Sequence, residues 1–262
     1  MNKIKVSLIG YGYWGPKLAR NFQNSNFFNV SQIIDTSNKN LQKAKKDFPL
    51  AQVSKNTNDI LKIKNLSLVI VASPTKTHFK ITKFALENKK NVLVEKPLST
   101  SLKEVKILEN LAKKNNVSLF VDYPFLFSGS VRFLKKIIQN KKYGNLIEIE
   151  SFREKAPIRS DCNVVWDLAP HDLSIMLHLV PYKPIAVQAH GMQYYRNGMV
   201  DMAYVKVFFE ENYLANFHLS WLSPTKVRRI TLAGNRRMMV YDDMESNEKI
   251  KIYDKGVEIL NS

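Results

Sequence analysis

Cysteine is nearly absent from this sequence, in which Cys162 is the one cysteine among 262 residues. A single cysteine cannot form an intramolecular disulfide, and such a chain fits the reducing cytoplasm, where we expect the protein to be located. Long apolar runs are lacking as well, since no stretch approaches the ~20 residues of a membrane-spanning helix. The apolar start is too short for a secretory signal and leads directly into a glycine motif. We therefore expect no membrane partner.

Acidic residues are few, with 23 Asp and Glu against 40 Lys and Arg, which gives a formal net charge of +17. Basic proteins often bind nucleic acid. Here the lysines are spread along most of the chain, without an arginine-rich arm, a zinc-binding spacing or an aromatic RNA-binding motif. The charge therefore indicates mainly a solvated surface, and we expect no nucleic-acid partner. Salt-dependent retention of the protein on DNA would instead support nucleic-acid binding. The positive field would also favour an anionic substrate such as a nucleotide sugar.

The first 122 residues alternate short apolar runs with helical segments. The apolar runs lack the alternation of a half-exposed strand, which is typical of parallel strands buried on both faces. We therefore predict an α/β domain with a doubly wound parallel sheet, a Rossmann fold, over residues 1–122. Its predicted strands are 4–9, 30–34, 66–72, 91–94 and 117–121, and its predicted helices are 16–24, 39–48, 76–88 and 101–115.

From residue 123 onward the pattern changes to successive strands with few helices. Turn residues at 210–212 and 234–235 separate β-rich runs, as they do in hairpins. Residues 123–262 are therefore expected to form an α+β domain with a mostly antiparallel sheet, one face of which needs cover. The predicted helices are 129–140 and 167–179, and the predicted strands are 146–152, 184–191, 201–209, 213–221, 227–233, 237–242 and 249–253.

A glycine-rich loop follows the first predicted strand and opens the first predicted helix. It has the pattern G-x-G-x-x-G and consists of Gly10, Tyr11, Gly12, Tyr13, Trp14 and Gly15. In such loops the first glycine permits a tight turn, the second lets the backbone approach a pyrophosphate, and the third allows close helix–strand packing. The helix N-terminus then offers free amides to the phosphates. The loop predicts a dinucleotide-binding site.

Asp35 closes the second predicted strand, at the spacing from the glycine loop that dinucleotide-binding folds use. A carboxylate at this place can accept hydrogen bonds from both ribose hydroxyls and would repel a 2′-phosphate. NAD is thus the expected cofactor in preference to NADP. The alternative is that Asp35 only caps a helix.

Polar residues and prolines follow the ends of the next predicted strands, where ligands bind in sheets of this kind. The residues expected to line the cofactor site there are Ser73, Pro74, Thr75, His78, Glu95 and Lys96. His78 could instead cap a helix or lie on the surface, and Lys96 could be one more surface lysine. The peptide bonds before Pro74 and Pro97 could be cis.

Four motifs occur in order along the chain: Gly10–Gly15, Pro74 with His78, the run Glu95-Lys96-Pro97, and the stretch from Asp167 to His171. Together they resemble the glucose–fructose oxidoreductase, inositol dehydrogenase and rhizopine-catabolism (Gfo/Idh/MocA) family. The resemblance covers nearly the whole chain. Residues 163–172 and 240–245 look like the branch linked to nucleotide-sugar and surface-polysaccharide synthesis.

The resemblance implies an NAD(P)-dependent dehydrogenase that oxidises a sugar or nucleotide-sugar hydroxyl. It also implies a homodimer or homotetramer that assembles through the open face of the C-terminal sheet. The family's catalytic lysine corresponds to Lys96, and its aspartate and histidine correspond to Asp167 and His171. Family chains usually continue beyond the equivalent of residues 253–256 into a helical segment, so we expect this chain, which ends at Ser262, to be shortened at its C-terminus.

Asp167 and His171 are four residues apart at the start of a predicted helix, with Pro170 in its first turn, so both lie on one face. Histidine can take and return a proton near neutral pH, and Lys96 would stabilise a developing alkoxide. Asp167 would hold substrate hydroxyls or orient His171. Alternatively, Asp167 caps the helix and His171 is a core residue. The neighbours expected to contact the substrate are Tyr123, Arg153, Asn163 and Trp166.

The histidines lack the spacing of a zinc site, so we expect no metal. A sugar or nucleotide-sugar dehydrogenase is the favoured hypothesis. Two alternatives remain open: a reductase of another ketosugar, an inosose or an imine, and a non-catalytic NAD-binding protein.

Overall fold

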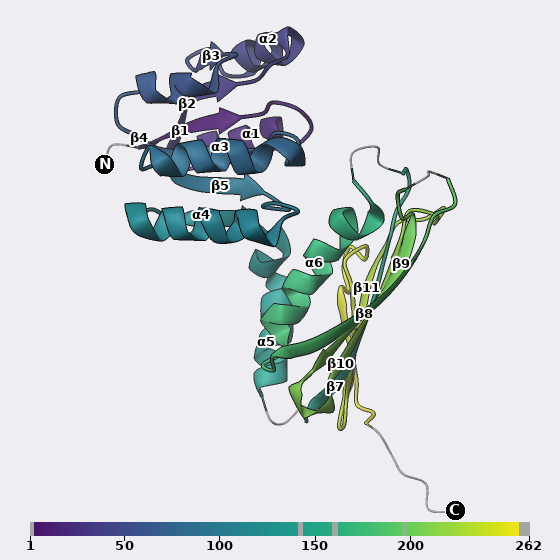
Figure 1. Cartoon of the computed structure of the whole chain (residues 1–262). Coiled ribbons are helices and arrows are strands. Elements are labelled where there is room, and N and C mark those ends of the chain that lie inside the picture. Colours follow the sequence, from purple (N-terminus) through teal and green to yellow (C-terminus); the bar gives the residue numbers. More distant parts are fainter. Residues whose placement is uncertain (1–2, 141–143, 159–161, 196–197, 257–262) are drawn as a thin grey trace, which may run out of the picture. The chain divides into compact units, whose positions relative to one another are not determined.

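The computed structural model of the chain describes residues 3–140, 144–158, 162–195 and 198–256. Its contacts fall into two compact units, unit 1 (Met1–Asp122) and unit 2 (Tyr123–Ser262), both drawn in Figure 1. Residues 257–262, on which the expected shortening bears, lie outside the described residues. Among the described residues no helix is both long and apolar enough to cross a membrane.

Unit 1 is built on a six-stranded sheet in the order β3-β2-β1-β4-β5-β6, and every neighbouring pair is parallel. Leu8, Ile33 and Ile70, on the three central strands, are each 0% exposed. Burial on both faces explains why these strands are continuous apolar runs, and the predicted Rossmann fold is confirmed. The strands are β1 (Ile4–Ile9), β2 (Phe28–Ile34), β3 (Gln52–Ser54), β4 (Leu66–Val71), β5 (Asn91–Glu95) and β6 (Leu119–Asp122).

Four α-helices connect these strands: α1 (Gly15–Asn24), α2 (Asn38–Asp47), α3 (Thr75–Glu87) and α4 (Leu102–Asn115). A 3₁₀ helix spans Thr57–Lys62. The strand order reverses between β1 and β4, and in such sheets a ligand binds beyond the carboxyl ends of the strands at this point. The segments that follow β1 and β4 are the glycine loop and the turn at Ser73, so both lie where a dinucleotide would bind.

Unit 2 contains a seven-stranded sheet in the order β13-β12-β11-β7-β10-β9-β8. All neighbouring pairs are antiparallel except β7 and β10, which run parallel, so the prediction of a mostly antiparallel sheet is confirmed. The strands are β7 (Leu146–Glu154), β8 (Pro184–Met192), β9 (Met202–Phe209), β10 (Leu214–Ser220), β11 (Val227–Gly234), β12 (Met238–Asp242) and β13 (Ile250–Tyr253).

Helices α5 (Gly129–Gln139) and α6 (Val164–Leu179) cover one face of this sheet (Figure 1). Their apolar side chains pack with the inward side chains of the strands, which include Ile149, Phe217 and Leu219. Along β9, Val205 is 8% exposed but its neighbour Tyr204 is 50% exposed, because successive side chains point to opposite faces. Within the described residues, the face that carries Tyr204 has no covering helix.

The start of α6 differs from the prediction. The helix begins at Val164, three residues earlier than predicted, because the Asn163 side chain accepts a hydrogen bond from Trp166 N at 3.0 Å and so caps the N-terminus. The prediction that Pro170 lies in the first turn is therefore wrong, since it lies in the helix interior. Asp167 and His171 remain four residues apart in one helix, which keeps them on one face.

Candidate functional site

The glycine loop has two closely packed positions and one open position. Gly10 has φ +98°, and a Cβ there would lie 2.6 Å from the backbone of Ala72 and Ser73. A Cβ at Gly15 would lie 2.1 Å from Gly10 O. At Gly12, by contrast, no heavy atom lies within 4 Å of where a Cβ would be. The open space is therefore at the second glycine, where a pyrophosphate must approach the backbone, so the loop fits a dinucleotide.

Asp35, at the end of β2, holds the glycine loop. One carboxylate oxygen accepts a hydrogen bond from Tyr11 N at 2.6 Å and another from Asn40 Nδ2 at 3.1 Å. The other oxygen accepts from Ser37 N at 2.8 Å. Carboxylate oxygens have several acceptor sites, so these contacts leave capacity for ribose hydroxyls. The predicted cofactor residue is therefore placed next to the loop it should serve.

The aromatic residues of the loop lie in different environments. Tyr11 is 1% exposed, and its hydroxyl donates to Asp47 Oδ2 at 2.8 Å, so only its backbone is available at the loop surface. Tyr13 and Trp14 are 75% and 48% exposed. Lys17 Nζ lies 3.7 Å from the Tyr13 ring centre and 4.2 Å from that of Trp14, both cation–π contacts. A cation is thus held beside the N-terminus of α1.

His78 joins the ends of two strands. It is 1% exposed, with Nε2 2.8 Å from Ser73 O beyond β4 and Nδ1 2.8 Å from Pro97 O beyond β5. Because both ring nitrogens contact the backbone of unit 1, His78 would support a cofactor through these two turns. Thr75 begins α3 next to the first turn. Within the described residues, the cis peptide bonds are Lys96–Pro97 and Ala156–Pro157, so the bond before Pro97 is cis and the bond before Pro74 is not.

Glu95 and Asp122 are register partners at the ends of β5 and β6, and their carboxyl groups hydrogen-bond to each other. Burial, followed by the charge of Asp122, raises the pKa of Glu95 to about 7, while the charge of Lys96 acts in the opposite direction. Burial also raises the pKa of Asp122. Asp122 was not predicted as a site residue. The sequence feature that could have identified it is an acidic residue at the end of a predicted strand, as for Glu95.

In unit 2, Asp167 is 3% exposed and is held by two residues that the sequence analysis missed. Its Oδ2 lies 2.9 Å from Lys155 Nζ and accepts a hydrogen bond from Trp221 Nε1 at 3.2 Å. The His171 ring contacts the Phe125 ring edge-on at 5.4 Å. The structure thus brings the Asp167–His171 pair together with a lysine from the end of β7 and a tryptophan from the end of β10.

The other expected substrate residues have structural contacts. Arg153 is 4% exposed; its Nε donates to Asp172 Oδ2 at 2.7 Å and its Nη2 to Asp172 Oδ1. Its guanidinium also lies 4.9 Å from the Phe125 ring centre. Asn163 caps α6, and Trp166 in the first turn of that helix is 39% exposed. Burial raises the pKa of Tyr123. Of this group, Trp166 has the most accessible side chain for stacking on a sugar.

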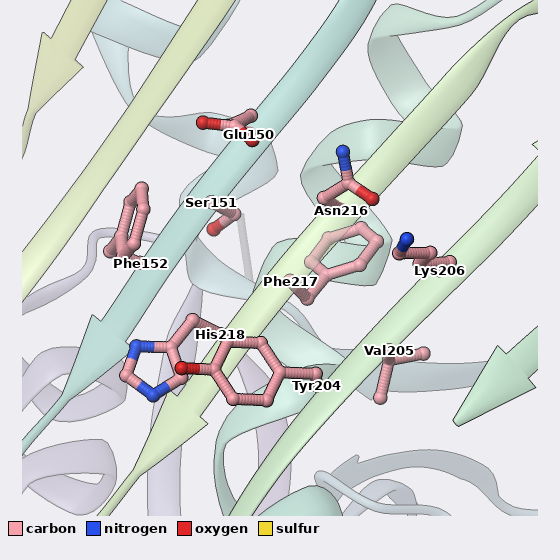
Figure 2. Close-up of a pocket in the computed structure, with 9 residues that line it drawn as sticks. All are labelled: Glu150, Ser151, Phe152, Tyr204, Val205, Lys206, Asn216, Phe217 and His218. Atoms are coloured by element: carbon pink, nitrogen blue, oxygen red, sulfur yellow. The ribbon is translucent and has the colours of Figure 1, made fainter. Parts of the chain in front are cut away.

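A cavity of about 230 Å³ lies on the open face of the unit 2 sheet (Figure 2). There the His218 ring stacks on Tyr204 at 4.6 Å, and His218 Nδ1 lies 3.0 Å from Glu154 Oε1. None of the expected site residues lines it; its lining consists of Glu150, Ser151, Phe152, Tyr204, Val205, Lys206, Asn216, Phe217 and His218. Among the described residues, no group of three or more His, Cys, Asp or Glu side chains could hold a metal ion.

Comparison with protein families gives two matches. Residues 4–123 match a model described as "Oxidoreductase family, NAD-binding Rossmann fold". Residues 131–240 match a model described as "GFO/IDH/MocA C-terminal domain". The first match contains all six strands of the unit 1 sheet, and the second contains β7 to β11 and the first part of β12 in the unit 2 sheet.

Comparison with curated proteins and solved structures agrees with these matches. A UDP-N-acetylglucosamine 3-dehydrogenase from Acidithiobacillus ferrooxidans is 22% identical over 98% of this chain and 79% of its own length. A myo-inositol 2-dehydrogenase from Thermotoga maritima is 26% identical over 80% of this chain and 66% of its own length. A structure of GenD2, from gentamicin A biosynthesis, in complex with NAD has a TM-score of 0.87 and 20% identity, covering 92% of this chain and 73% of that one. For four of the curated relatives, the match covers between 42% and 66% of the relative's own length.

Proposed function

Because the chain belongs to the Gfo/Idh/MocA oxidoreductase family, we propose that it is an NAD-dependent dehydrogenase that oxidises a sugar hydroxyl. The observation that carries this proposal is the buried Asp167 on α6, held by Lys155 and Trp221 and four residues before His171. A carboxylate fixed on the same helix face as a histidine can orient either the imidazole or a substrate hydroxyl.

The chemistry requires a base and a cation. Oxidation of a secondary alcohol removes a proton from oxygen and a hydride from carbon, and bound NAD would supply the hydride acceptor. We propose that His171 takes the proton and that Lys96 stabilises the negative charge that develops on the oxygen. Asp167 would orient His171 or hold an adjacent hydroxyl.

The carboxylate of Asp35 supports NAD in preference to NADP. It accepts hydrogen bonds from Tyr11 N and Ser37 N and would meet a 2′-phosphate with like charge. The other proposed cofactor contacts are the glycine loop, with its open position at Gly12, and the turns that begin at Ser73 and Glu95.

For the substrate we propose a nucleotide sugar used in surface-polysaccharide synthesis in the cytoplasm. The match to the UDP-N-acetylglucosamine 3-dehydrogenase covers 98% of this chain, which supports this choice. The match to the myo-inositol 2-dehydrogenase supports a second candidate, an inositol or inosose. Reduction of another ketosugar or an imine, or NAD binding without turnover, are the remaining alternatives.

We also propose that the open face of the unit 2 sheet pairs with a second copy of the chain, giving a homodimer or homotetramer. Tyr204 and Phe152, both labelled in Figure 2, are 50% and 38% exposed on this face. Phe208, four residues after Tyr204 on β9, is 38% exposed, so the face carries a large apolar surface for a protein without a partner. In a two-fold interface the same patch is used on both copies. Light scattering should report an oligomer that Tyr204→Asp weakens, and a monomeric parent protein would contradict this.

The test of the proposed activity is NADH formation with a panel of UDP-N-acetylglucosamine, its uronate and myo-inositol. The parent protein should turn over at least one of them, and His171→Ala should not. NADH binding without turnover of any candidate, in either direction, would favour the non-catalytic alternative.

A further inference from the structure

Lys155 is a partly exposed lysine beside the α6 pair, outside the catalytic set that the family resemblance implies. It directly follows β7, and its backbone N donates to Ser220 O at 3.0 Å. Its Nζ lies 2.9 Å from Asp167 Oδ2, with side-chain exposures of 33% for Lys155 and 3% for Asp167. Lys155 is therefore the more exposed member of this ion pair, and Asp167 is the buried one.

The position of this ammonium group is fixed at both ends of the side chain. β7 and β10 run parallel with Glu154 opposite Ser220, so the residues that follow them, Lys155 and Trp221, leave the same edge of the sheet. Trp221 is 1% exposed and donates from Nε1 to the same Asp167 oxygen that Lys155 contacts. The location of Lys155 relative to α6, and hence to His171, is thus set by packed elements.

The chemistry that Lys155 presents outward is that of a hydrogen-bond donor. An ammonium group has three N–H donors and no acceptor, so contact with Asp167 leaves donors for another group. Two arginines described in this unit are paired with other carboxylates, Arg153 with Asp172 and Arg228 with Asp243 at 2.8 Å. A partly desolvated cation attracts an anion more strongly than a fully hydrated one does. The matching ligand group is therefore a carboxylate or a phosphate.

We infer that Lys155 binds an anionic group of the substrate and so makes the enzyme specific for an acidic or nucleotide-linked sugar over a neutral one. The inference rests on the proposed function for the reaction, but the binding step stands apart from turnover. The anion is either a carboxylate on the sugar ring or the diphosphate of a nucleotide sugar.

Titration calorimetry on the NADH-loaded protein tests the binding step. The probes are UDP-N-acetylglucosaminuronate, UDP-N-acetylglucosamine and UDP alone. Lys155→Met should weaken binding of the uronate at least ~10-fold, the scale for losing one charged hydrogen bond, and Lys155→Arg should restore part of it. Loss confined to the uronate identifies a carboxylate contact, and equal loss for all three probes identifies the diphosphate. The matched control is Lys251→Met, a lysine of the same unit paired with Glu248 at 3.9 Å, which should bind like the parent.

Kinetics separate substrate binding from a role in positioning Asp167. If Lys155 binds the anion, Lys155→Met should raise KM for acidic sugars and leave KM for neutral sugars like that of the parent, even though loss of the ion pair with Asp167 lowers kcat for both. A fall in kcat for charged and neutral substrates with no change in KM for the acidic ones would mean that Lys155 only positions Asp167, and the inference would be overturned. It is also overturned if Lys155→Met binds all three probes like the parent, or if the parent binds none of them. Turnover of myo-inositol by such a parent would leave the proposed function intact. Conversely, anion binding through Lys155 without turnover of any sugar would support the inference and contradict the proposed function.

Discussion

Glu95 and Asp122 lie opposite each other at the ends of neighbouring parallel strands, and their carboxyl groups hydrogen-bond to each other. Two ionised carboxylates cannot form this bond because neither has a donor, so the bond requires a proton on one of the two groups. Lys96, the proposed catalytic lysine, follows Glu95 directly in the chain. The protonation of the pair therefore changes the charge next to this lysine.

The first prediction concerns stability and pH. The pKa of Glu95 is about 7 in the folded protein, raised from 4.5, so the folded state keeps this proton at pH values where the unfolded state has lost it. The stabilisation from this group is fully present below pH ~4.5 and is lost as pH rises through about 7. The free energy of unfolding, measured with denaturant at pH values between 4.5 and about 7, should fall less with rising pH for Glu95→Gln than for the parent. The exposed Glu109→Gln on α4 is the control and should decline like the parent.

The second prediction concerns the choice of cofactor. NADH should bind at least ~10-fold more tightly than NADPH, a difference of ~1.4 kcal/mol, because a 2′-phosphate would meet the Asp35 carboxylate. Asp35→Ala should narrow this ratio, measured by fluorescence titration of both cofactors. Because Asp35 also accepts from Tyr11 N, the variant should lose some affinity for NADH as well. Equal affinities in the parent would contradict the role of Asp35.

The third prediction separates two glycines of one loop. A Cβ at Gly12 would meet no heavy atom within 4 Å, so Gly12→Val should fold with a near-normal melting temperature but lose NADH binding. Gly10 combines φ +98° with backbone atoms 2.6 Å from a Cβ, so Gly10→Ala should lower the melting temperature itself. Normal NADH binding by Gly12→Val would exclude the loop as the pyrophosphate site.

The fourth prediction concerns the proposed acid–base set. Lys96→Met and His171→Ala should each lower kcat by ~10²-fold or more, and both should still bind NADH. The double variant should have a kcat only slightly lower than that of either single variant, because the effects of substituting groups that act as a unit are not additive. Asp167→Asn should lower kcat less than either of these variants if Asp167 only orients His171. Near-normal turnover by His171→Ala would remove this residue from the mechanism.

The long elements of the fold could be predicted from sequence because their patterns are strong. The central strands of unit 1 are continuous apolar runs, and the order of strands and helices leaves few alternatives to a doubly wound sheet. β3 was missed because it has only three residues, of which two are exposed. The early start of α6 was missed because Asn163 was considered as a substrate contact and its capping role was overlooked.

The candidate site was harder to predict because its key contacts are distant in sequence. His78 has the same surroundings in the sequence whether it faces a ribose or bridges Ser73 O and Pro97 O, and only the packing of two strand ends distinguishes these cases. Lys155 is one of 40 basic residues, and nothing in its neighbours marks it. Its pairing with Asp167 depends on a strand arrangement that a linear pattern does not contain.

The parallel pairing of β7 and β10 has a consequence for the folding kinetics of unit 2. β7 is synthesised first among its sheet strands, yet its hydrogen-bonding neighbours β10 and β11 come much later in the chain. Loop closure over such sequence distances is costly in entropy, and topologies of this kind fold slowly. The hydrogen bond between Asp167 and Trp221 also forms late, because Trp221 is 54 residues further along the chain. During synthesis on the ribosome, α6 can form early, but its acidic side chain acquires its tryptophan partner only when the central strands of the sheet assemble.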